Sequence, residues 1–184
     1  MPSRDAELIQ RAKNGDQEAL VEIYECYRTS VFTYIFYRVS DQESAEDLTA
    51  EVFMRMLTKI HTYVYQTRPF LAWLYTIARN LVIDHYRNCS KLTTTPLEDG
   101  LLASDNGHPG KVTEDHMDQE CLAKAMKYLT EEQRQVIILK FIEGRENGEV
   151  AEIMGKNERA VRSLQHRALV VLQKVMEQER CYEP

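Results

Sequence analysis

The chain of 184 residues is poor in the residues that make turns, with seven glycines and five prolines. Because turn-rich β folds use both residues freely, their scarcity favours helices. No apolar run approaches the length of a membrane span, and the N-terminal segment 1–8 has no signal-peptide core. The sequence therefore predicts a cytoplasmic protein with no direct membrane insertion.

Cysteine is also scarce, with four residues and no CxxC pair. His85 and Cys89 have the i, i+4 spacing of two metal ligands on a helix, but the sequence offers no further ligand close by. We therefore expect no metal and no cofactor, and no disulfide in a reducing compartment. The sequence shows no nucleophile–base pair and no phosphate loop, so we do not expect an enzyme.

A strong positive charge is missing as well, since the net charge is −6. Residues 1–89 carry 10 basic and 12 acidic side chains, residues 90–120 carry 2 and 7, and residues 121–184 carry 11 and 10. Because neither end is strongly basic, tight unaided DNA binding through phosphate neutralisation is not expected. Any role on DNA therefore requires help from a larger partner.

The segment 129–175 predicts three helices separated by two tight breaks. Thr130 is a good N-cap, and the acidic residues after it suit a helix N-terminus. Gly144 ends the first of these helices, and Gly155 supplies the positive φ of the second turn. The apolar face of the first helix is predicted to contain Val136, Ile137, Leu139 or the stem of Lys140, and Phe141.

A short helix, a three-residue turn and a helix with basic residues in its first turns form a helix-turn-helix pattern. The last helix begins near Glu158, and Val161, Leu164 and Ala168 form its inner side. The side chains expected to reach DNA are Arg159, Arg162, Ser163, His166 and Arg167. The major groove admits one such helix. The alternative is an ordinary helical hairpin with a solvated basic face.

The pattern of apolar residues in segment 1–89 predicts four helices, with N-caps at Asp5 and Asp16 and a break at Ser40. Segment 90–117 loses the pattern and reads as a flexible acidic linker. We therefore predict an all-α fold of two small helical domains, residues 1–89 and 118–184, joined by this linker.

Three segments in this order resemble the extracytoplasmic-function (ECF) group of bacterial RNA polymerase sigma factors. They are AEDLTAEVFMRM at 45–56, PFLAWLYTIARNLVIDHYR at 69–87, and the helix-turn-helix. The resemblance covers both domains and the linker. It implies a sigma domain two, a sigma domain four, and an activity: binding core RNA polymerase and directing it to particular promoters. An anti-sigma factor is a common partner in this family.

The resemblance assigns polymerase docking on the clamp helices to Asp47, Leu48, Glu51 and Phe53. An acidic, partly apolar face suits a basic coiled-coil partner, because charge complementarity speeds docking. The alternative is a solvated acidic face with Leu48 and Phe53 in the core.

Segment 63–87 corresponds to the family's reader of the minus-ten element. It interleaves aromatic and cationic side chains, which suits unpaired bases and their phosphates. The loop 65–68 is predicted to hold a flipped base. The side chains expected to contact the strand are Arg68, Trp73, Arg79, Asn80 and Arg87. The alternatives place Trp73 mainly in the core and pair Asp84 with Arg87.

The helix-turn-helix residues named above correspond to the family's minus-thirty-five reader. An arginine forked onto a guanine edge contributes ~1–3 kcal/mol of discrimination between bases. The chain departs from the family pattern at Ala50, at Asn147-Gly148 and at Leu164-Gln165. The departure at Leu164-Gln165 changes which side chains the helix exposes. The promoter sequences read by other family members therefore cannot be assigned to this chain.

The resemblance also gives the linker a role, because in the family this segment threads polymerase channels that hold nucleic acid. Two other functions stay open at this point. One is a stand-alone helix-turn-helix regulator, which would have no use for the aromatic-cationic helix after Pro69. The other is a degenerate sigma-like interaction module. Ala50 and Gly148 support this alternative, because both depart from the family pattern.

Overall fold

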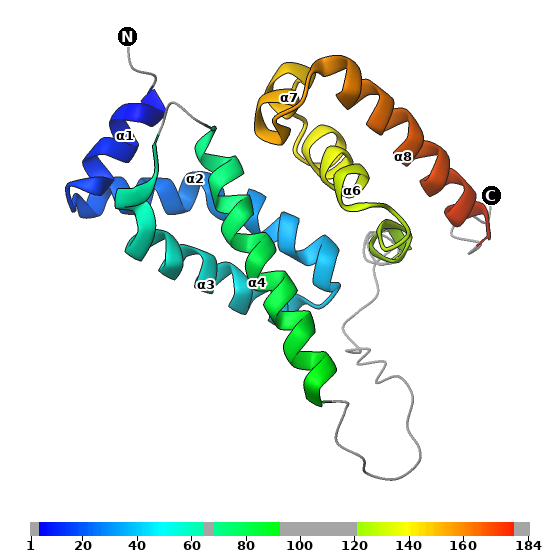
Figure 1. Cartoon of the computed structure of the whole chain (residues 1–184), viewed down its shortest axis with the longest axis horizontal. Coiled ribbons are helices and arrows are strands. Elements are labelled where there is room, and N and C mark those ends of the chain that lie inside the picture. The colour runs from blue at the N-terminus through cyan, green and yellow to red at the C-terminus, as the bar shows by residue number, and fades with distance from the viewer. Residues whose placement is uncertain (1–3, 65–67, 93–120, 179–184) are drawn as a thin grey trace.

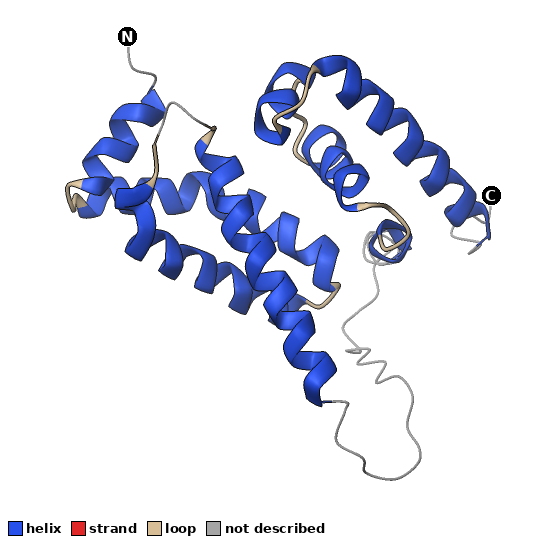
Figure 2. Ribbon diagram, in the orientation of Figure 1, coloured by secondary structure: helices blue, strands red, loops and turns tan. Residues whose placement is uncertain are grey.

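The structure, a computed structural model, describes residues 4–64, 68–92 and 121–178. Two helical bodies lie side by side (Figure 1), and the regular structure throughout the described residues is helical (Figure 2). Within those residues no helix is both long and apolar enough to cross a membrane. Most of the predicted flipped-base loop and most of the predicted linker lie outside the described residues. The all-α fold of two sigma-type domains is confirmed.

The N-terminal body, which we call domain two, is built on three long helices that pack against one another. Their core holds fully buried residues from each helix, such as Ile23, Val52 and Leu74. The last helix continues beyond residue 89, where the domain was expected to end. The elements are α1 (Arg4–Lys13), α2 (Gln17–Val39), α3 (Gln42–Lys59), the short 3-10 helix η1 (Ile60–Thr62) and α4 (Phe70–Leu92).

Local hydrogen bonds explain where these helices begin. The Asp16 carboxylate accepts from the backbone N–H groups of Glu18 and Ala19, which confirms the predicted N-cap of α2. The N-cap predicted at Asp5 is wrong, because Asp5 lies inside the first turn of α1. An acidic residue in the first turn still favours the helix, since it faces the positive end of the helix dipole.

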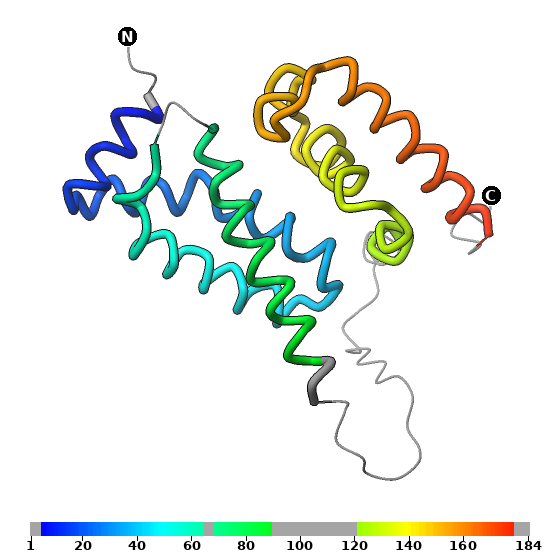
Figure 3. Tube along the Cα trace, in the orientation of Figure 1, coloured from blue at the N-terminus to red at the C-terminus, as the bar shows by residue number. Residues whose placement is uncertain are grey.

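The C-terminal body, which we call domain four, contains the helix-turn-helix. Thr130 caps its helix α6 in a reciprocal capping box with Gln133, and Gly155 has a φ of 63°, as both were predicted to do. Figure 3 follows the chain through this body. After a helical segment at 121–126, its elements are α6 (Glu131–Ile137), the π-helical turn η2 (Ile138–Ile142), α7 (Asn147–Met154) and α8 (Glu158–Gln178).

The π-helical turn η2 corrects one expectation. Val136, Ile137 and Leu139 are buried as predicted, but the side chain of Phe141 is 54% exposed. A π-helical turn holds more residues than an α-helical turn, so it shifts every later side chain around the axis. The regular helical period used for the prediction therefore placed Phe141 on the wrong side.

The cysteines differ in state. The thiol of Cys26 is free, whereas Cys121 is disulfide-bonded. The expectation that the chain forms no disulfide is therefore wrong at Cys121. That expectation rested on the redox state of the compartment, which says nothing about which cysteines the fold brings together.

Candidate polymerase and nucleic-acid interfaces

Helix α8 presents the five predicted duplex-reading side chains to solvent. Arg159, Arg162, Ser163, His166 and Arg167 are all exposed, and the inner residues of the same turns are buried. Arg159, Arg162 and His166 recur at helical spacing, so they share one side of α8. The exposed side therefore carries the cations that a major-groove reader requires.

A side-chain bridge fixes α8 against α7. The amide Nε2 of Gln165 donates to Oδ1 of Asn147 over 2.9 Å. Both residues belong to the departures from the family pattern noted above, and here they form a hydrogen bond with each other.

Arg162 forms an exposed pair with Glu158 at 2.9 Å. Such a pair is worth little in water, so a phosphate or base edge can replace it.

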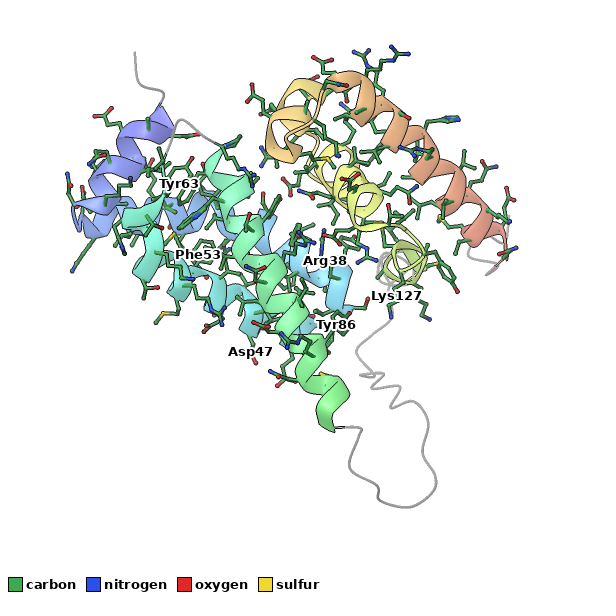
Figure 4. The ribbon with its side chains drawn as sticks, viewed as in Figure 1. Arg38, Asp47, Phe53, Tyr63, Tyr86 and Lys127 are labelled. Carbon is green, nitrogen blue, oxygen red and sulfur yellow. The ribbon has the colours of Figure 1, made fainter. Side chains whose placement is uncertain are left out.

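Helix α3 carries three of the four predicted polymerase-docking residues at its surface. Asp47 and Glu51 are exposed, and Leu48 is half-buried. Phe53 is only 6% exposed, and its ring meets Tyr24 edge-on at a centroid distance of 4.9 Å. The expected polymerase contact of the Phe53 ring does not fit this core position, which Figure 4 shows relative to Asp47.

The predicted minus-ten residues divide into exposed cations and one packed aromatic. Arg68, Arg79, Asn80 and Arg87 are exposed. Trp73 is half-buried, and its ring lies 5.4 Å from the ring centroids of both Tyr63 and Phe70. Trp73 therefore belongs to an aromatic cluster at the start of α4, and it is only partly accessible.

The Arg87 guanidinium lies 3.8 Å from the Asp84 carboxylate. Both side chains are mostly exposed, so this pair, too, contributes little in water. This contact is the pairing of Asp84 with Arg87 that the sequence analysis gave as an alternative.

The two domains meet at a junction that joins α2 and α4 of domain two to domain four. At one end, Oε1 of Glu131 accepts hydrogen bonds from Arg38 Nε at 2.9 Å and from the Tyr34 hydroxyl at 3.0 Å. The Arg38 guanidinium also lies over the Tyr34 ring, 3.3 Å from its centroid. Because the Arg38 side chain is only 3% exposed, its charge depends on these partners.

At the other end of the junction, the carboxylate of Glu143 is bound from both bodies. The Tyr75 hydroxyl donates to Oε1 at 2.9 Å, and the Ser30 hydroxyl donates to Oε2 at 3.1 Å. Arg145 of domain four donates to Oε2 at 2.7 Å. The rings of Tyr34 and Tyr75 stack at 4.3 Å, so the two ends of the junction form one connected network.

Electrostatics at the junction follow from burial and from these partners. Burial raises the pKa of Tyr34, and the charges of Arg38 and Arg79 oppose that rise. Burial alone would raise the pKa of Glu131, but the charge of Arg38 and the hydrogen bonds from Arg38 and Tyr34 hold it below its ordinary value of 4.5. Glu131 is therefore the anionic partner of a buried guanidinium.

An open hollow of about 550 Å³ lies beside Glu131. Arg79, a predicted minus-ten residue, lines it together with Arg38 and Tyr86, and Lys127 and Arg134 line it from domain four. Figure 4 shows Arg38, Tyr86 and Lys127 around this end of the junction. A second hollow contains Arg68 on one side and Glu149 and Glu152 on the other.

The sequence analysis missed the junction. It assigned no site role to Tyr34, Tyr75, Glu131 or Glu143. One signal was available: Arg38 follows the apolar run of α2, at helical spacing from buried Tyr34 and Val31. A cation on the inner side of a helix needs a carboxylate partner from elsewhere in the fold.

Comparison with known proteins identifies both bodies. Residues 23–91 match the family described as Sigma-70 region 2, and residues 119–172 match the family described as Sigma-70, region 4. The chain resembles the solved structure of CnrH in complex with the cytosolic domain of CnrY, with a TM-score of 0.67 and 20% identity, over 93% of this chain and 96% of the other. That likeness shows the fold.

Two curated relatives align along most of the chain. The ECF RNA polymerase sigma factor BldN of Streptomyces coelicolor is 37% identical over 95% of this chain, which spans 66% of the length of BldN. The ECF RNA polymerase sigma factor SigX of Bacillus subtilis is 31% identical over 88% of this chain and 85% of its own length. The order of the two domains and these identities agree with the resemblance seen in the sequence: the chain belongs to the ECF group of RNA polymerase sigma factors.

Proposed function

We propose that this protein binds core RNA polymerase and directs promoter-specific initiation of transcription, without catalysing a reaction itself. One observation carries the proposal: an acidic exposed face on α3 and a basic exposed face on α8 stand on separate domains of a chain in the ECF family. The first face suits the clamp helices of polymerase and the second suits duplex DNA.

The proposed mechanism divides the work between the domains. Asp47, Leu48 and Glu51 dock on polymerase. Arg68, Arg79, Asn80 and Arg87, with the accessible part of Trp73, hold the melted minus-ten strand, where cations bind phosphates and aromatic rings contact bases. The duplex at the minus-thirty-five element is contacted by Arg159, Arg162, Ser163, His166 and Arg167.

Polymerase supplies the affinity that this chain lacks. The net charge of −6 leaves little to drive DNA binding by phosphate neutralisation alone. Once α3 is docked, both readers act at a high effective concentration on the same promoter. The proposed site of action is the cytoplasm, where polymerase works.

Two further roles belong to this proposal. The acidic segment between the domains enters a basic channel of polymerase, because a run of negative charges resembles a phosphate chain. An anti-sigma factor, where the cell makes one, covers the faces of α3 and α4. Both roles depend on complementary charge.

The test is transcription by a reconstituted holoenzyme. Purified protein is added to core polymerase with fragmented genomic DNA, and new transcript starts are mapped. Starts that share two spaced sequence motifs are the expected result. Binding to duplex DNA without polymerase would instead favour a stand-alone helix-turn-helix regulator. Polymerase binding with no new starts would favour a degenerate interaction module.

A further inference from the structure

Tyr63 joins the end of α1 to the start of α4. It belongs to segment 63–87, whose aromatic rings were expected to contact bases, but its side chain is only 3% exposed. Its hydroxyl donates to the backbone carbonyl of Arg68, and its own carbonyl accepts a hydrogen bond from Nζ of Lys13. Figure 4 shows Tyr63 in this part of domain two. A ring buried this deeply cannot stack on a base, so any contribution to strand binding acts through its neighbours.

The ring of Tyr63 supports one residue that is assigned to the melted strand. It meets Phe70 edge-on at a centroid distance of 5.1 Å, and it lies 5.4 Å from the centroid of Trp73. Phe70 also lies 5.4 Å from Trp73, so two rings contact the half-buried indole. The orientation of Trp73 therefore depends on Tyr63 and Phe70.

The hydroxyl of Tyr63 supports a second residue that is assigned to the strand. Arg68 is exposed and lies just before α4, which begins at Phe70. The hydrogen bond from Tyr63 fixes the carbonyl of Arg68 and, with it, the point from which the guanidinium extends. An arginine whose backbone is already fixed loses less freedom when it binds a phosphate.

Lys13 fixes Tyr63 from helix α1. Lys13 is the last residue of α1, and it reaches a carbonyl that lies 50 positions further along the chain. The N–H of Tyr63 also donates to the carbonyl of Ile60 at 3.1 Å, so the backbone of Tyr63 is held at both of its polar groups. Helix α1 is itself anchored in the core of domain two by the buried residues Leu8, Ile9 and Ala12.

We infer that Tyr63 and Lys13 are positioning residues for recognition of the melted minus-ten strand. Tyr63 holds Arg68 in place for a phosphate and Trp73 in place for a base, and Lys13 holds Tyr63. The inference rests on the proposed function, which assigns Arg68 and Trp73 to that strand. Helix α1 thereby influences strand binding, although none of its residues is assigned to DNA.

The experiment measures how tightly the full-length protein binds oligothymidylate, through the fluorescence of Trp73, the only tryptophan in the sequence. A base that contacts the indole should quench its emission. The main variant is Tyr63→Phe, which removes the hydroxyl and keeps the ring. The matched control is Tyr24→Phe, because the Tyr24 ring contacts Phe53 of α3. Circular dichroism checks that each variant is folded.

Tyr63→Phe should bind oligothymidylate several-fold more weakly than wild type, because Arg68 must then be ordered during binding. The emission maximum of the free variant should match that of wild type, since the rings remain packed. Tyr24→Phe should bind as wild type does. Equal affinity of Tyr63→Phe and wild type, or no quenching of Trp73 in wild type, would overturn the inference.

Salt dependence separates positioning from a merely structural role. Each phosphate contact to a single strand adds about 0.7 to the slope of log affinity against log salt concentration. Arg68→Ala should lower this slope by about 0.7, and Tyr63→Phe should lower it in the same direction. A loss of fold stability alone would leave the slope unchanged, and an unchanged slope in Tyr63→Phe would overturn the inference.

A double-mutant cycle tests whether the Tyr63 hydroxyl acts through Arg68. The variant that combines Tyr63→Phe with Arg68→Ala should bind oligothymidylate about as tightly as Arg68→Ala alone, because the hydroxyl has no guanidinium left to position. Additive losses would show that the two residues act independently, and this result would also overturn the inference.

Lys13 is tested by removing its donor and by replacing it conservatively. Lys13→Met should weaken binding more than Lys59→Met, which removes the same charge from an exposed position at the end of α3. Lys13→Arg keeps a donor and the charge, and it should bind more tightly than Lys13→Met. Equal losses from the two methionine variants would assign the effect to net charge and overturn the role of Lys13.

The proposed function and this inference can fail separately. If wild-type protein with core polymerase starts no transcripts, the proposed function fails, whatever the oligonucleotide measurements give. If transcripts start normally but Tyr63→Phe binds oligothymidylate as wild type does, the inference alone fails.

Discussion

The two helices proposed to contact DNA, α4 and α8, stand in opposite situations. Helix α8 turns its cations to solvent, and those cations lie outside both junction hollows. Helix α4 places Tyr75 and Arg79 along the junction, where domain four packs on it. The reader of duplex DNA is therefore free in this structure, whereas the reader of the melted strand shares its surface with the other domain.

This difference follows the order of events that initiation requires. Duplex contacts come before melting, so a free α8 can take part in the first encounter with a promoter. A strand exists only after melting, so the packing of domain four on part of α4 does not hinder that first encounter. The predictions below test each side of this comparison.

The largest effect is expected on α8. Arg162→Ala with Arg167→Ala removes two proposed base or phosphate contacts, each worth ~1–3 kcal/mol. Promoter binding by the holoenzyme should fall ten-fold or more, measured by electrophoretic mobility shift, while affinity for core polymerase stays unchanged. Lys124→Ala with Lys174→Ala removes the same charge from exposed sites of domain four and is the control. If both pairs of substitutions reduced promoter binding equally, α8 would not be the helix that reads the promoter.

The helix caps give the next largest effect and compare the stability of the two domains. Thr130→Ala removes the capping box of α6, and Asp16→Ala removes the N-cap of α2. Each change should lower the free energy of unfolding by ~1 kcal/mol in urea titrations. Thr58→Ala, whose hydroxyl bonds a carbonyl within its own helix, should be nearly neutral. If Thr58→Ala lowered the free energy of unfolding as much as the two cap variants, the losses could not be assigned to the capping hydrogen bonds.

A smaller effect is expected at the acidic face of α3 that is proposed to dock on polymerase. This face belongs to neither of the two DNA readers. Asp47→Lys reverses an exposed charge on α3, so the association rate with core polymerase should fall several-fold, and less so in high salt. Surface plasmon resonance measures this rate. Glu177→Lys, at the far end of α8, is the matched reversal. If both variants slow association alike, the effect is one of net charge and α3 is not the docking face.

The smallest effect concerns pH. The pKa of Glu131 is lowered in this structure, so its contribution to holding the domains together is present above the ordinary value of 4.5 and is lost as the pH falls through the lowered pKa. The radius of gyration of wild-type protein should rise in that acidic range, before far-UV circular dichroism changes. Glu131→Gln should show no such step. An identical step in this variant would assign the transition to another group.

The sequence predicted those features that depend on neighbouring residues. Asp16, Thr130 and Gly155 act where their own backbone surroundings require a cap or a positive φ. The inner side of α8 also followed the helical period, because α8 is regular along its length. Phe141 did not follow the period, because the π-helical turn that contains it cannot be recognised from apolar spacing.

The candidate sites were predictable to different degrees. The exposed cations of α8 and the acidic pair on α3 could be placed from helical spacing alone. Phe53 could not, because its burial depends on Tyr24 from another helix. The junction was also out of reach, since Glu131 and Arg38 are 93 positions apart in the sequence and only the packing of the two domains brings them together.

The π-helical turn at Ile138–Ile142 has a consequence for how the chain tolerates length changes. Glu143 comes directly after this turn, which accommodates one residue more than an α-helical turn does. Each residue of an α-helix advances the side chains by about 100°. A deletion of one residue within the turn would restore regular winding and leave the carboxylate facing Tyr75, because four α-helical residues turn the chain about as far as the five residues of the π-helical turn. Relatives of this chain that are one residue shorter at this point would then keep both attachments between their domains.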